Sequence, residues 1–366
     1  MDLIYEGSVK NLWKGPTEDT IDFEFTDAYS VFDWGRMPDS LPGKGAALAG
    51  IGAHFFQALA TPGAWRDLLS SDLEALTSFY GRRDAELAQM IEQQWVVLGR
   101  EGMAHHLIDQ PAPNRLRVKR VNISPVRTLS LAGQSLYEYT SGAFPRFIPL
   151  EVVFRFGMPE GSSLAERLTS EYAGQLGFDR QPPVGSLFVA PIIEFFTKLE
   201  SRDRFLTMQE ALLISGLDRR SFRQLFVSNL LVAVFLKHEF QKIKLSLWDG
   251  KCEWAEFRGD STGDVPTVIT LVDSIGPDEL RLSDEIGSQI SKEFLRCFYR
   301  ETAWYEATKK AKKLASERGL SDWKVLMAEL GFAQPPALDE STHSKAQKMY
   351  SDLLAALKAC SAKGGA

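Results

Sequence analysis

The hydrophobic pattern divides the chain into segments with a strand period and segments with a helix period. Alternating or β-branched apolar positions predict strands within 1–33 and at 115–125, 148–157 and 244–257. Apolar positions three and four residues apart predict helices at 46–60, 65–97 and 219–243. The last of these helices is apolar at its centre, which indicates that it is buried.

Connectors and a helical tail separate these segments. A loop is expected at 38–45, a turn around 258–266 and a return strand at 267–282. Residues 126–147 follow no simple period and are interpreted as an insertion. From about Glu301 onwards the pattern is helical, which predicts an additional helical segment at the end of the chain.

Length and composition refine this division. The chain has 366 residues, which corresponds to about two domains of ~150 residues each. Hydrophobic residues make up 44% and charged residues 25%, as in ordinary globular proteins with a sizeable core. Together with the mixture of strand and helix periods, this predicts an α+β protein.

Charge and cysteine usage exclude several classes of protein. A net charge of −6 argues against binding nucleic acid through its phosphates, although it is compatible with a local cationic pocket for a small anion. No apolar run approaches the ~20 residues that span a bilayer, and the N-terminus shows no secretion signal. The three scattered cysteines indicate a reducing cytoplasm. The five histidines have no metal-binding spacing, and His105 and His106 are expected in a loop or at the surface.

The stretch SLWDGKCEW, residues 246–254, has an unusual charge pattern for a strand. Asp249, Lys251 and Glu253 occupy every second position, so they share one face. The residues expected to face a core lie at the alternate positions and are Trp248, Cys252 and Trp254. The stretch therefore predicts a strand with an acid, a base and an acid on one side.

The return strand supplies a second carboxylate. A hairpin that turns around 258–266 would bring Asp273 near Glu253. Two adjacent carboxylates repel each other unless a cation lies between them, and Mg²⁺ prefers one or two carboxylates plus substrate phosphates. The pair therefore predicts a metal–nucleotide site in which Lys251 binds a substrate anion. The alternative from spacing alone is an exposed strand face with a surface ion pair, which contributes little stability.

Eight short motifs follow one another in a single order from the first strand to the return strand. They are Tyr5–Lys10, Thr26–Asp33, Lys44–Gly45, Val118–Arg120, Pro149–Arg155 with Gly161–Ser162 beyond it, Thr197–Glu200 with Asp203, Leu247–Trp254, and Asp273–Arg281. The series resembles that of the phosphoribosylaminoimidazole-succinocarboxamide synthase (SAICAR synthetase) family. Each motif alone is weak, but eight in series are a strong signal, and the chain is interpreted as a divergent member.

The resemblance implies a reaction and a fold. Members of this family join L-aspartate to the carboxylate of carboxyaminoimidazole ribotide (CAIR) through an acyl phosphate, consuming ATP in the presence of Mg²⁺. The implied fold is two-lobed, with a small antiparallel-sheet N-terminal lobe over a larger α+β lobe that grasps ATP. This chain would add C-terminal helices, so the expected division is an N-terminal sheet lobe at 1–123, a larger α+β lobe at 124–300 and a C-terminal helical extension at 301–366. The implied partners are the small molecules CAIR, L-aspartate and ATP, and the oligomeric state stays open.

The resemblance also implies roles for individual residues. The metal ligands are Glu253 and Asp273, and the catalytic candidates are Lys251, Asp249 and Lys198. The ATP-binding candidates are Gly7, Ser8, Lys10 and Lys119, of which Lys119 also suits an exposed strand. The substrate-binding candidates are Arg155, Ser162 or its neighbour Ser163, Arg281, Asp278, Asp33 and Lys44. Arginine forks suit the ribotide phosphate because they donate in a bidentate geometry.

Several positions depart from the family pattern. Ser8 stands where the family has the first lysine of the loop, and Ser274 stands where an acid follows the metal-binding aspartate. Residues 33–39 are an unusual aspartate-side loop. The retained acids and cations favour the same reaction. The alternatives are an ATP-dependent carboxylate–amine ligase with another substrate, a small-molecule kinase of the same architecture, and a non-catalytic nucleotide-binding protein.

Overall fold

The structure, a computed structural model, describes residues 2–68, 70–200, 203–258, 267–320 and 322–364. It divides into two compact units, each discontinuous in sequence. The first unit comprises Met1–His54, Leu107–Lys119 and Gly276–Ala366, and the second comprises Phe55–His106 and Arg120–Ile275. These units follow the chain differently from the ranges 1–123, 124–300 and 301–366, which stay a prediction of domain organisation.

An antiparallel sheet forms the centre of the first unit, with strands in the order β1-β2-β3-β5-β4. The strands are β1 (Leu3–Glu6), β2 (Lys10–Lys14), β3 (Thr20–Phe25), β4 (Leu107–Ala112) and β5 (Arg115–Lys119). The strands predicted within 1–33 and from residue 115 are confirmed. Phe23, Leu116 and Val118 are buried on one face, as expected for a sheet with one face packed on a core.

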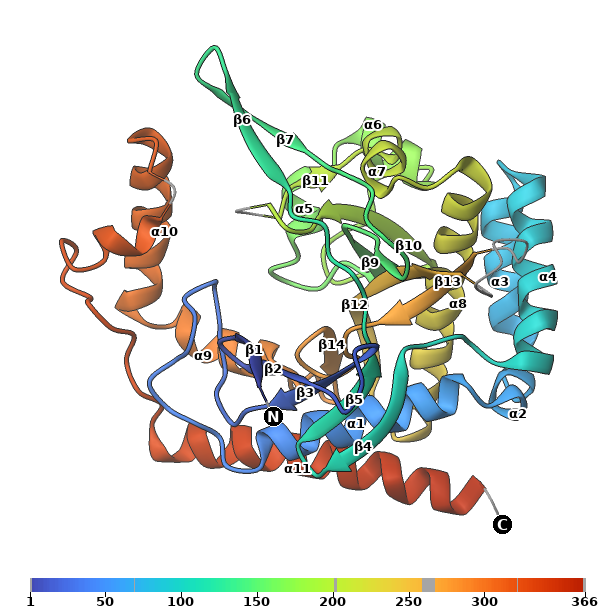
Figure 1. The fold of residues 1–366 in the computed structure, drawn as a ribbon, viewed down its shortest axis with the longest axis horizontal. Helices are drawn as coiled ribbons and strands as arrows, with labels where there is room; N and C mark the ends of the chain where they lie inside the picture. Colours follow the sequence, from blue (N-terminus) through green and yellow to red (C-terminus); the bar gives the residue numbers. More distant parts are fainter. Residues whose placement is uncertain (1, 69, 201–202, 259–266, 321, 365–366) are drawn as a thin grey trace. The chain divides into compact units, whose positions relative to one another are not determined.

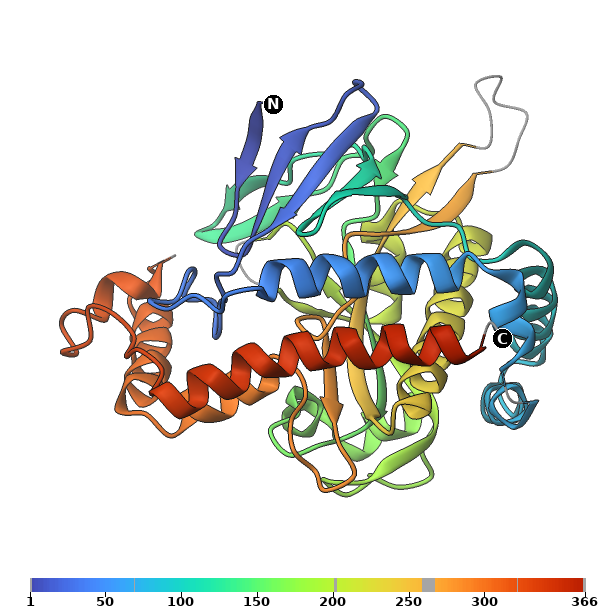
Figure 2. The same cartoon turned by 90° about the horizontal axis from the view of Figure 1, so that it is seen from below.

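Helices complete the first unit. They are the beginning of α1 (Lys44–Leu59), α9 (Glu293–Arg300), α10 (Ala303–Glu317), the 3-10 helix η1 (Trp323–Leu326) and α11 (Glu340–Gly364), with the short strand β14 (Leu280–Ser283). A Cβ atom at Gly45 would lie 2.3 Å from the carbonyl oxygen of Phe25, so only glycine fits at this helix start. Figure 2 shows α1 and α11 side by side, and Leu354 of α11 lies against Gly50 of α1.

A second antiparallel sheet forms the centre of the second unit, in the order β11-β10-β9-β12-β13, with β8 beside β12. Its strands are β8 (Arg146–Phe147), β9 (Leu150–Gly157), β10 (Leu187–Thr197), β11 (Phe205–Leu206), β12 (Ser246–Phe257) and β13 (Val268–Val272). The strands predicted at 148–157 and 244–257 are confirmed. The single return strand at 267–282 is wrong, because the chain leaves the strand geometry at Asp273, where φ is 65°. Most of the predicted turn at 258–266 lies outside the described residues.

Besides the end of α1, seven helices are described in the second unit. They are α2 (Pro62–Arg66), α3 (Ser70–Gly81), α4 (Ala85–Glu101), α5 (Ser163–Arg167), α6 (Ser170–Leu176), α7 (Met208–Ser215) and α8 (Arg219–Lys242). The centre of α8 is buried, as its apolar sequence predicted. The ring of Phe222 lies 5.1 Å from that of Phe195 in β10, and Trp254 Nε1 of β12 donates to Asn229 Oδ1 at 3.0 Å. Helix α8 therefore covers the apolar face of this sheet.

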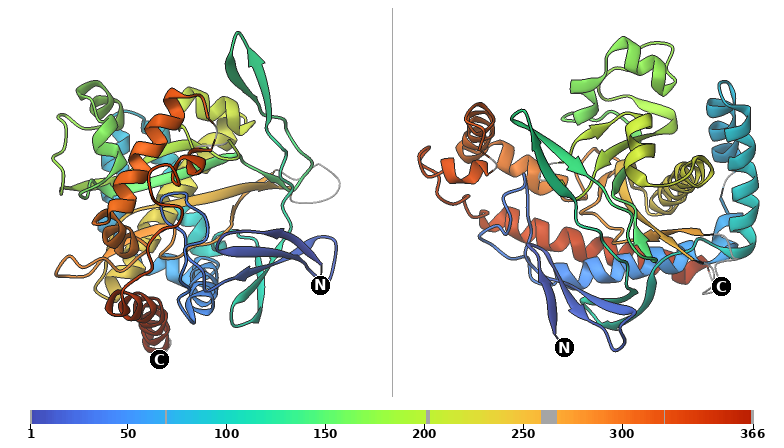
Figure 3. Two further views of the ribbon diagram at one scale, coloured as in Figure 1. Left: turned by 90° about the vertical axis from the view of Figure 1, so that its left-hand side faces the viewer. Right: turned by 45° about the horizontal axis from the view of Figure 1, so that its top comes forward.

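The segment interpreted as an insertion, 126–147, contains a protruding hairpin. Strands β6 (Arg127–Leu131) and β7 (Gln134–Glu138) pair only with each other among the described strands, and they extend away from the second-unit sheet (Figures 1 and 3). Its leucines Leu129, Leu131 and Leu136 are exposed. Within the described ranges, no helix combines the length and hydrophobicity required to cross a membrane.

Candidate active site

Neighbouring strands of the second-unit sheet build a charged face. Asp249 of β12 pairs directly with Arg155 of β9, and Lys251 pairs with Val153. Because residues two apart in a strand share a face, Glu151 and Arg155 of β9 lie with Asp249, Lys251 and Glu253 of β12 on the side opposite to α8. Cys252 and Trp254 lie on the α8 side and are 2% and 0% exposed, while Trp248 is half-buried. The alternation predicted for 246–254 is confirmed.

Glu253 and Asp273 lie close enough for their charges to interact. Glu253 pairs with Val272, so a regular strand would turn the next residue to the opposite face. The left-handed backbone at Asp273 interrupts this alternation. Burial, and then the charge of Asp273, raise the pKa of Glu253. The two carboxylates approach each other as predicted, and their role as metal ligands stays a prediction.

Two lysines and a third carboxylate surround Glu253. The Nζ atom of Lys198 lies 2.7 Å from Glu253 Oε1 and 3.1 Å from Glu151 Oε1. Lys251 forms a second ion pair with Glu151. Burial opposes the charge of both lysines, but the neighbouring carboxylates outweigh it and raise the pKa of each. The set of described side chains contains three carboxylates and two ammonium groups, so its net charge is −1 when all are ionised. The members are Glu151, Glu253, Asp273, Lys198 and Lys251.

Arg155 belongs to a second cluster on the same face of the sheet. Its guanidinium donates to Glu194 of β10, to Asp249 Oδ2 at 3.2 Å and to Ser163 Oγ at 3.3 Å. Burial alone would raise the pKa of Glu194, but the charges of Arg155 and Arg167 outweigh it, so the pKa of Glu194 is lowered. The structure therefore joins the catalytic candidate Asp249 to the substrate candidate Arg155 in one buried ion network.

The neighbouring helix α5 positions the serines of the predicted phosphate loop. Ser162 caps this helix by accepting from the backbone N–H of Leu164. Sequence reasoning allowed either serine as a ligand. In the structure Ser162 is buried at the cap, and Ser163 is the serine whose hydroxyl contacts Arg155.

The predicted ATP loop lies at the turn between β1 and β2 in the first unit. The backbone N–H of Gly7 donates to the carbonyl of Lys10 at 3.1 Å, and a Cβ atom at Gly7 would lie 2.4 Å from that oxygen. Ser8 occupies the turn between them. The Nζ atom of Lys10 lies 4.4 Å from the centroid of the Phe23 ring. This loop has a backbone geometry that depends on glycine.

The strand register places the two lysines that were predicted to bind ATP on opposite faces of the sheet. Lys10 pairs with Phe25, and Lys119 pairs with Thr20. Phe25 and Thr20 are five residues apart in one strand, so they and their partners face opposite sides of the sheet. Lys119 is exposed at the end of β5, which matches the alternative of an exposed strand lysine.

Lys44 and Asp278, both predicted to bind substrate, form a buried ion pair in the first unit. Lys44 Nζ lies 2.9 Å from Asp278 Oδ2, and the hydroxyl of Tyr350 donates to Asp278 Oδ1 at 2.7 Å. Burial opposes the charge of Asp278, but Lys44 and Lys292 outweigh it and lower the pKa of Asp278 to about 2. Lys44 is only 1% exposed, and its ammonium group neutralises the charge of Asp278 in this structure.

The two remaining substrate candidates also lie in the first unit. Asp33 is exposed, has a φ of 63° and accepts from Lys312 Nζ at 3.0 Å. Arg281 Nη2 lies 4.0 Å from Glu293 Oε2. Because Arg281 and Arg155 belong to different units, their predicted meeting at one ribotide phosphate stays a prediction.

The chemistry of the Glu253–Asp273 pair fits a divalent cation. Over the described residues, no group of three or more His, Cys, Asp or Glu side chains is arranged to hold a metal ion. Mg²⁺ does not require such a group, because one or two carboxylates suffice when waters and substrate phosphates complete its shell. The two residues supply hard oxygen donors. Burial raises the pKa of Glu253 most, and the charge of Asp273 raises it further, a repulsion that a cation would relieve.

Sequence reasoning gave no role to Glu151, Glu194 or His106, which all contact candidate residues. His106, expected in a loop or at the surface, does lie in the irregular segment before β4, but it is only 2% exposed and therefore not at the surface. It packs against the ring of Phe56, and its Nε2 lies 3.0 Å from the carbonyl oxygen of Asp273. For Glu151, the available signal was its position four residues before Arg155, on the same face of the predicted strand.

Comparisons of the sequence with known proteins point to one family. The family model described as SAICAR synthetase matches residues 3–312. A putative phosphoribosylaminoimidazole-succinocarboxamide synthase from Archaeoglobus fulgidus is 30% identical over 350 residues, covering 94% of this chain and 91% of that protein. A phosphoribosylaminoimidazole-succinocarboxamide synthase from Thermoplasma acidophilum is 23% identical over 312 residues, covering 84% and 86%.

Solved structures share the fold. The SAICAR synthase from Saccharomyces cerevisiae, complexed with SAICAR, has a TM-score of 0.56 at 17% identity, covering 97% of this chain and 94% of that chain. A SAICAR synthetase (type 2) in complex with ADP has a TM-score of 0.52 at 21% identity, covering 81% and 90%. The predicted α+β fold with antiparallel sheets is confirmed. Because the family model matches most of the chain and the relative from Archaeoglobus fulgidus is 30% identical, this chain belongs to the SAICAR synthetase family.

Proposed function

We propose that this chain ligates L-aspartate to the carboxylate of CAIR, forming SAICAR, ADP and phosphate in de novo purine biosynthesis in the cytoplasm. Family membership makes it a ligase that forms a C–N bond with the use of ATP. The named relatives and a family structure with ADP support this assignment. The substrates, Mg²⁺ and the residue roles are the finer parts of the proposal.

The observation that carries the proposal is the charge arrangement around Glu253. Phosphoryl transfer depends mainly on positioning the reactants and neutralising their charge. Lys198 and Lys251 supply positive charge on the sheet face, and Glu253 with Asp273 would hold Mg²⁺. When bound, this ion would neutralise charge on the phosphates of ATP. A binding protein without catalysis would have no need of this carboxylate pair.

The reaction proceeds through two displacements. A carboxylate oxygen of CAIR attacks the γ-phosphorus of ATP, the bond to ADP breaks, and an acyl phosphate forms. The amine of L-aspartate then attacks the acyl carbon, phosphate leaves with the electron pair of the C–O bond, and the nitrogen loses a proton to give the amide. The raised pKa of Lys198 and of Lys251 keeps both ammonium groups protonated, so we assign them to orienting anionic oxygens.

The binding roles follow from the resemblance and are refined by the contacts. We assign ATP phosphates to the loop of Gly7, Ser8 and Lys10, and the ribotide phosphate to Arg281 and Arg155 with a serine of the α5 start. The Nε and Nη1 atoms of Arg155 already donate to Glu194 and Asp249. Its Nη2 atom, which contacts Ser163 in this structure, is therefore the one that we assign to the phosphate. Asp249 then acts by holding Arg155 in place.

The other substrate candidates lie in the first unit. Lys44 and Asp278 form a closed pair, so we assign them to fixing the chain near Arg281, which lies three residues after Asp278. Asp33 is exposed and stays our candidate on the aspartate side. The partners are small molecules, and the oligomeric state is open.

A direct assay tests the proposal. The purified full chain is supplied with ATP, Mg²⁺, L-aspartate and CAIR, and the succinylated product and ADP are both measured. We expect both to form at equal rates and only when all four components are present. Folded protein that forms no succinylated product would refute the proposed reaction. ADP formation with a phosphorylated product and no need for aspartate would indicate a kinase instead.

Arg281 tests the ribotide assignment separately. Arg281→Ala should weaken CAIR binding by roughly 1.5–3 kcal/mol, the range for a hydrogen bond to a charged group, and should affect ATP binding less. Isothermal titration with each ligand measures both effects. Arg318→Ala, a change at an exposed arginine of the same unit, is the control and should leave both affinities unchanged. Equal losses for CAIR and ATP would move Arg281 out of the ribotide site.

A further inference from the structure

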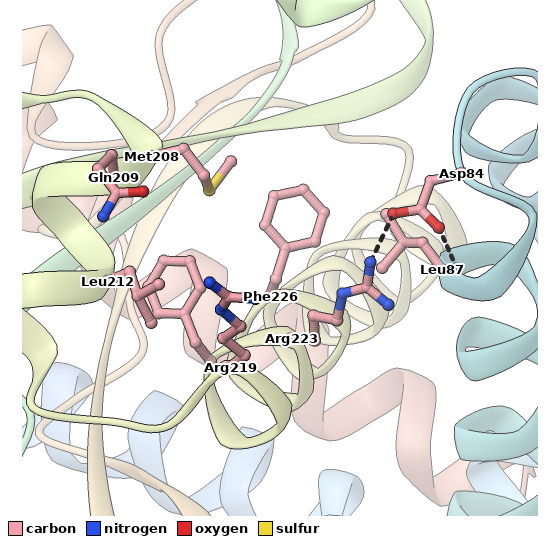
Figure 4. Close-up of a pocket in the computed structure, with 9 residues that line it drawn as sticks. Asp84, Leu87, Met208, Gln209, Leu212, Arg219, Arg223 and Phe226 are labelled. Carbon is pink, nitrogen blue, oxygen red and sulfur yellow. Dashed lines mark hydrogen bonds and ion pairs between the residues drawn. The ribbon is translucent and has the colours of Figure 1, made fainter.

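A cavity of about 430 Å³ lies in the second unit, among α4, α7 and the beginning of α8. Figure 4 shows the side chains that surround it. Its apolar lining is formed by Leu87, Met208, Leu212, Phe222 and Phe226. The volume is within the roughly 300–1,000 Å³ of typical small-molecule sites, and a mostly apolar lining with a few polar groups is their usual composition.

This cavity is distinct from the charged face around Glu253. Two rings of α8 pack against the ring of Phe195. Its centroid lies 5.1 Å from that of Phe222 and 6.4 Å from that of Phe226. Phe195 lies on the face of β10 that α8 covers, whereas Glu194, the preceding residue, faces the charged side. The cavity is therefore on the α8 side of the sheet, and the proposed ligase reaction makes no use of it.

Two arginines line the cavity, and they differ in their partners. Arg223 binds Asp84 at 3.1 Å, the ion pair drawn with a dashed line in Figure 4, and it also pairs with Glu86. In the part of the chain that the structure describes, no carboxylate lies within ion-pair distance of Arg219. Arg219 is exposed and stands at the first position of α8, beside the apolar lining.

The chemistry of the lining selects a class of ligand. The leucines, Met208 and the two phenylalanines provide an apolar surface that a hydrocarbon or aromatic body can cover. Arg219 adds one uncompensated positive charge with several N–H donors, which suits a carboxylate or sulfonate. A polyphosphate would need several uncompensated cations, and Arg223 is already paired.

We propose that this cavity binds a small ligand with an aromatic or aliphatic body and one anionic group, of the aryl carboxylate class. The body lies on the apolar lining, and the anionic group accepts hydrogen bonds from Arg219. The site is independent of the ligase reaction proposed above, so either proposal can fail without the other.

Isothermal titration of the full chain with 2-naphthoate tests the site, with neutral 2-naphthamide as the matched ligand. We expect saturable binding of both, with the carboxylate bound more tightly. Arg219→Gln should weaken 2-naphthoate about tenfold, the factor for one lost hydrogen bond to a charged group, and should leave 2-naphthamide unchanged. Leu212→Trp, which fills the cavity, should abolish binding of both ligands.

Arg220→Gln is the matched control, because Arg220 is the exposed neighbour that does not line the cavity. It should leave both affinities unchanged. Equal losses from Arg219→Gln and Arg220→Gln, or no saturable binding to the wild-type chain, would overturn the proposal. Loss of naphthoate binding in saturating ADP would place the ligand in the nucleotide site. A dimer that Leu212→Trp dissociates would make this surface an interface between copies. Either result also overturns the proposal.

Discussion

Two clusters of carboxylates and lysines, one in each unit, differ in their charge balance. In the first unit, Asp278 is held by Lys44 and Tyr350, and its pKa is lowered to about 2 although burial opposes its charge. In the second unit, Glu253 shares Lys198 with Glu151, and its pKa is raised by burial and by Asp273. One cluster has enough cations for its carboxylates, and the other has an excess of carboxylates.

This difference separates a structural ion pair from a candidate metal site. Both oxygens of Asp278 have a donor, so the cluster is complete without a ligand. Glu253 has a like charge beside it, which costs free energy that a bound cation would offset. From the sequence, Lys251 was a catalytic candidate that binds a substrate anion, and Lys44 was a substrate-binding candidate. The surroundings of Lys44 balance its charge, whereas those of Lys251 leave an excess of negative charge, and perturbed clusters of that kind are typical of functional sites.

The largest expected effect comes from removing charge at the unbalanced cluster. Glu253→Gln should lower the rate of SAICAR formation by at least about 100-fold, as for the loss of an electrostatic catalytic group. The midpoint of thermal unfolding should change by no more than a few degrees, because the change also removes a repulsion. Asp273→Asn should behave in the same way. Rate assays and thermal unfolding of both variants measure these effects.

The control for this prediction is Glu160→Gln, a change at an exposed carboxylate of the same unit. It should keep the wild-type rate. Near-normal turnover in either Glu253→Gln or Asp273→Asn would show that the pair does not bind the metal.

The balanced cluster should respond in the opposite way. Lys44→Met leaves Asp278 as a buried charge without its main partner, which typically costs 3–5 kcal/mol, about the cost of breaking a buried ion pair. Urea unfolding measures this loss, and Lys358→Met at an exposed position is the control. A double variant, Lys44→Met with Asp278→Leu, should recover much of the loss. A cost below ~1 kcal/mol would mean that the pair behaves like an exposed one.

Tyr350 extends the comparison to the helix α11, which lies beyond the family match at 3–312. Tyr350→Phe removes one hydrogen bond to a charged group and should cost roughly 1.5–3 kcal/mol of the free energy of unfolding. Tyr305→Phe, in α10 of the same unit, is the matched control and should cost less than the Tyr350 change. Urea unfolding of both variants tests the difference. Equal losses would show that the contact with Asp278 contributes no specific stability.

The pKa of Asp278 predicts the smallest effect, which appears in the pH dependence. Its pKa is lowered from 3.8 to about 2 on folding, so the stabilisation is complete above about pH 4 and is lost as the pH falls towards 2. Over this range, the difference in free energy of unfolding between the wild-type chain and Asp278→Asn should shrink by roughly 2 kcal/mol. Urea unfolding at several pH values measures it. A difference that is constant with pH would mean that Asp278 is not stabilised as an ion.

The sequence by itself determined which residues share a face and which segments are buried. The two-residue period of 246–254 placed Asp249, Lys251 and Glu253 together, and the apolar centre of 219–243 predicted the buried helix α8. These features depend on local backbone geometry, which repeats within one element. The series of motifs also indicated the family without a structure, because each motif is a short segment and the order of the motifs can be read from the sequence.

Only the tertiary structure decided which groups meet. Glu151 reaches Lys251 across 100 positions of sequence, and Lys44 reaches Asp278 across 234. Strand order and register determine such contacts, and a local period contains no information about either. The same reason explains why Lys10 and Lys119 face opposite sides of one sheet, and why His106 is buried beside Asp273. Chemistry depends on these distant meetings, so it was the tertiary structure that distinguished the balanced ion pair from the candidate metal site.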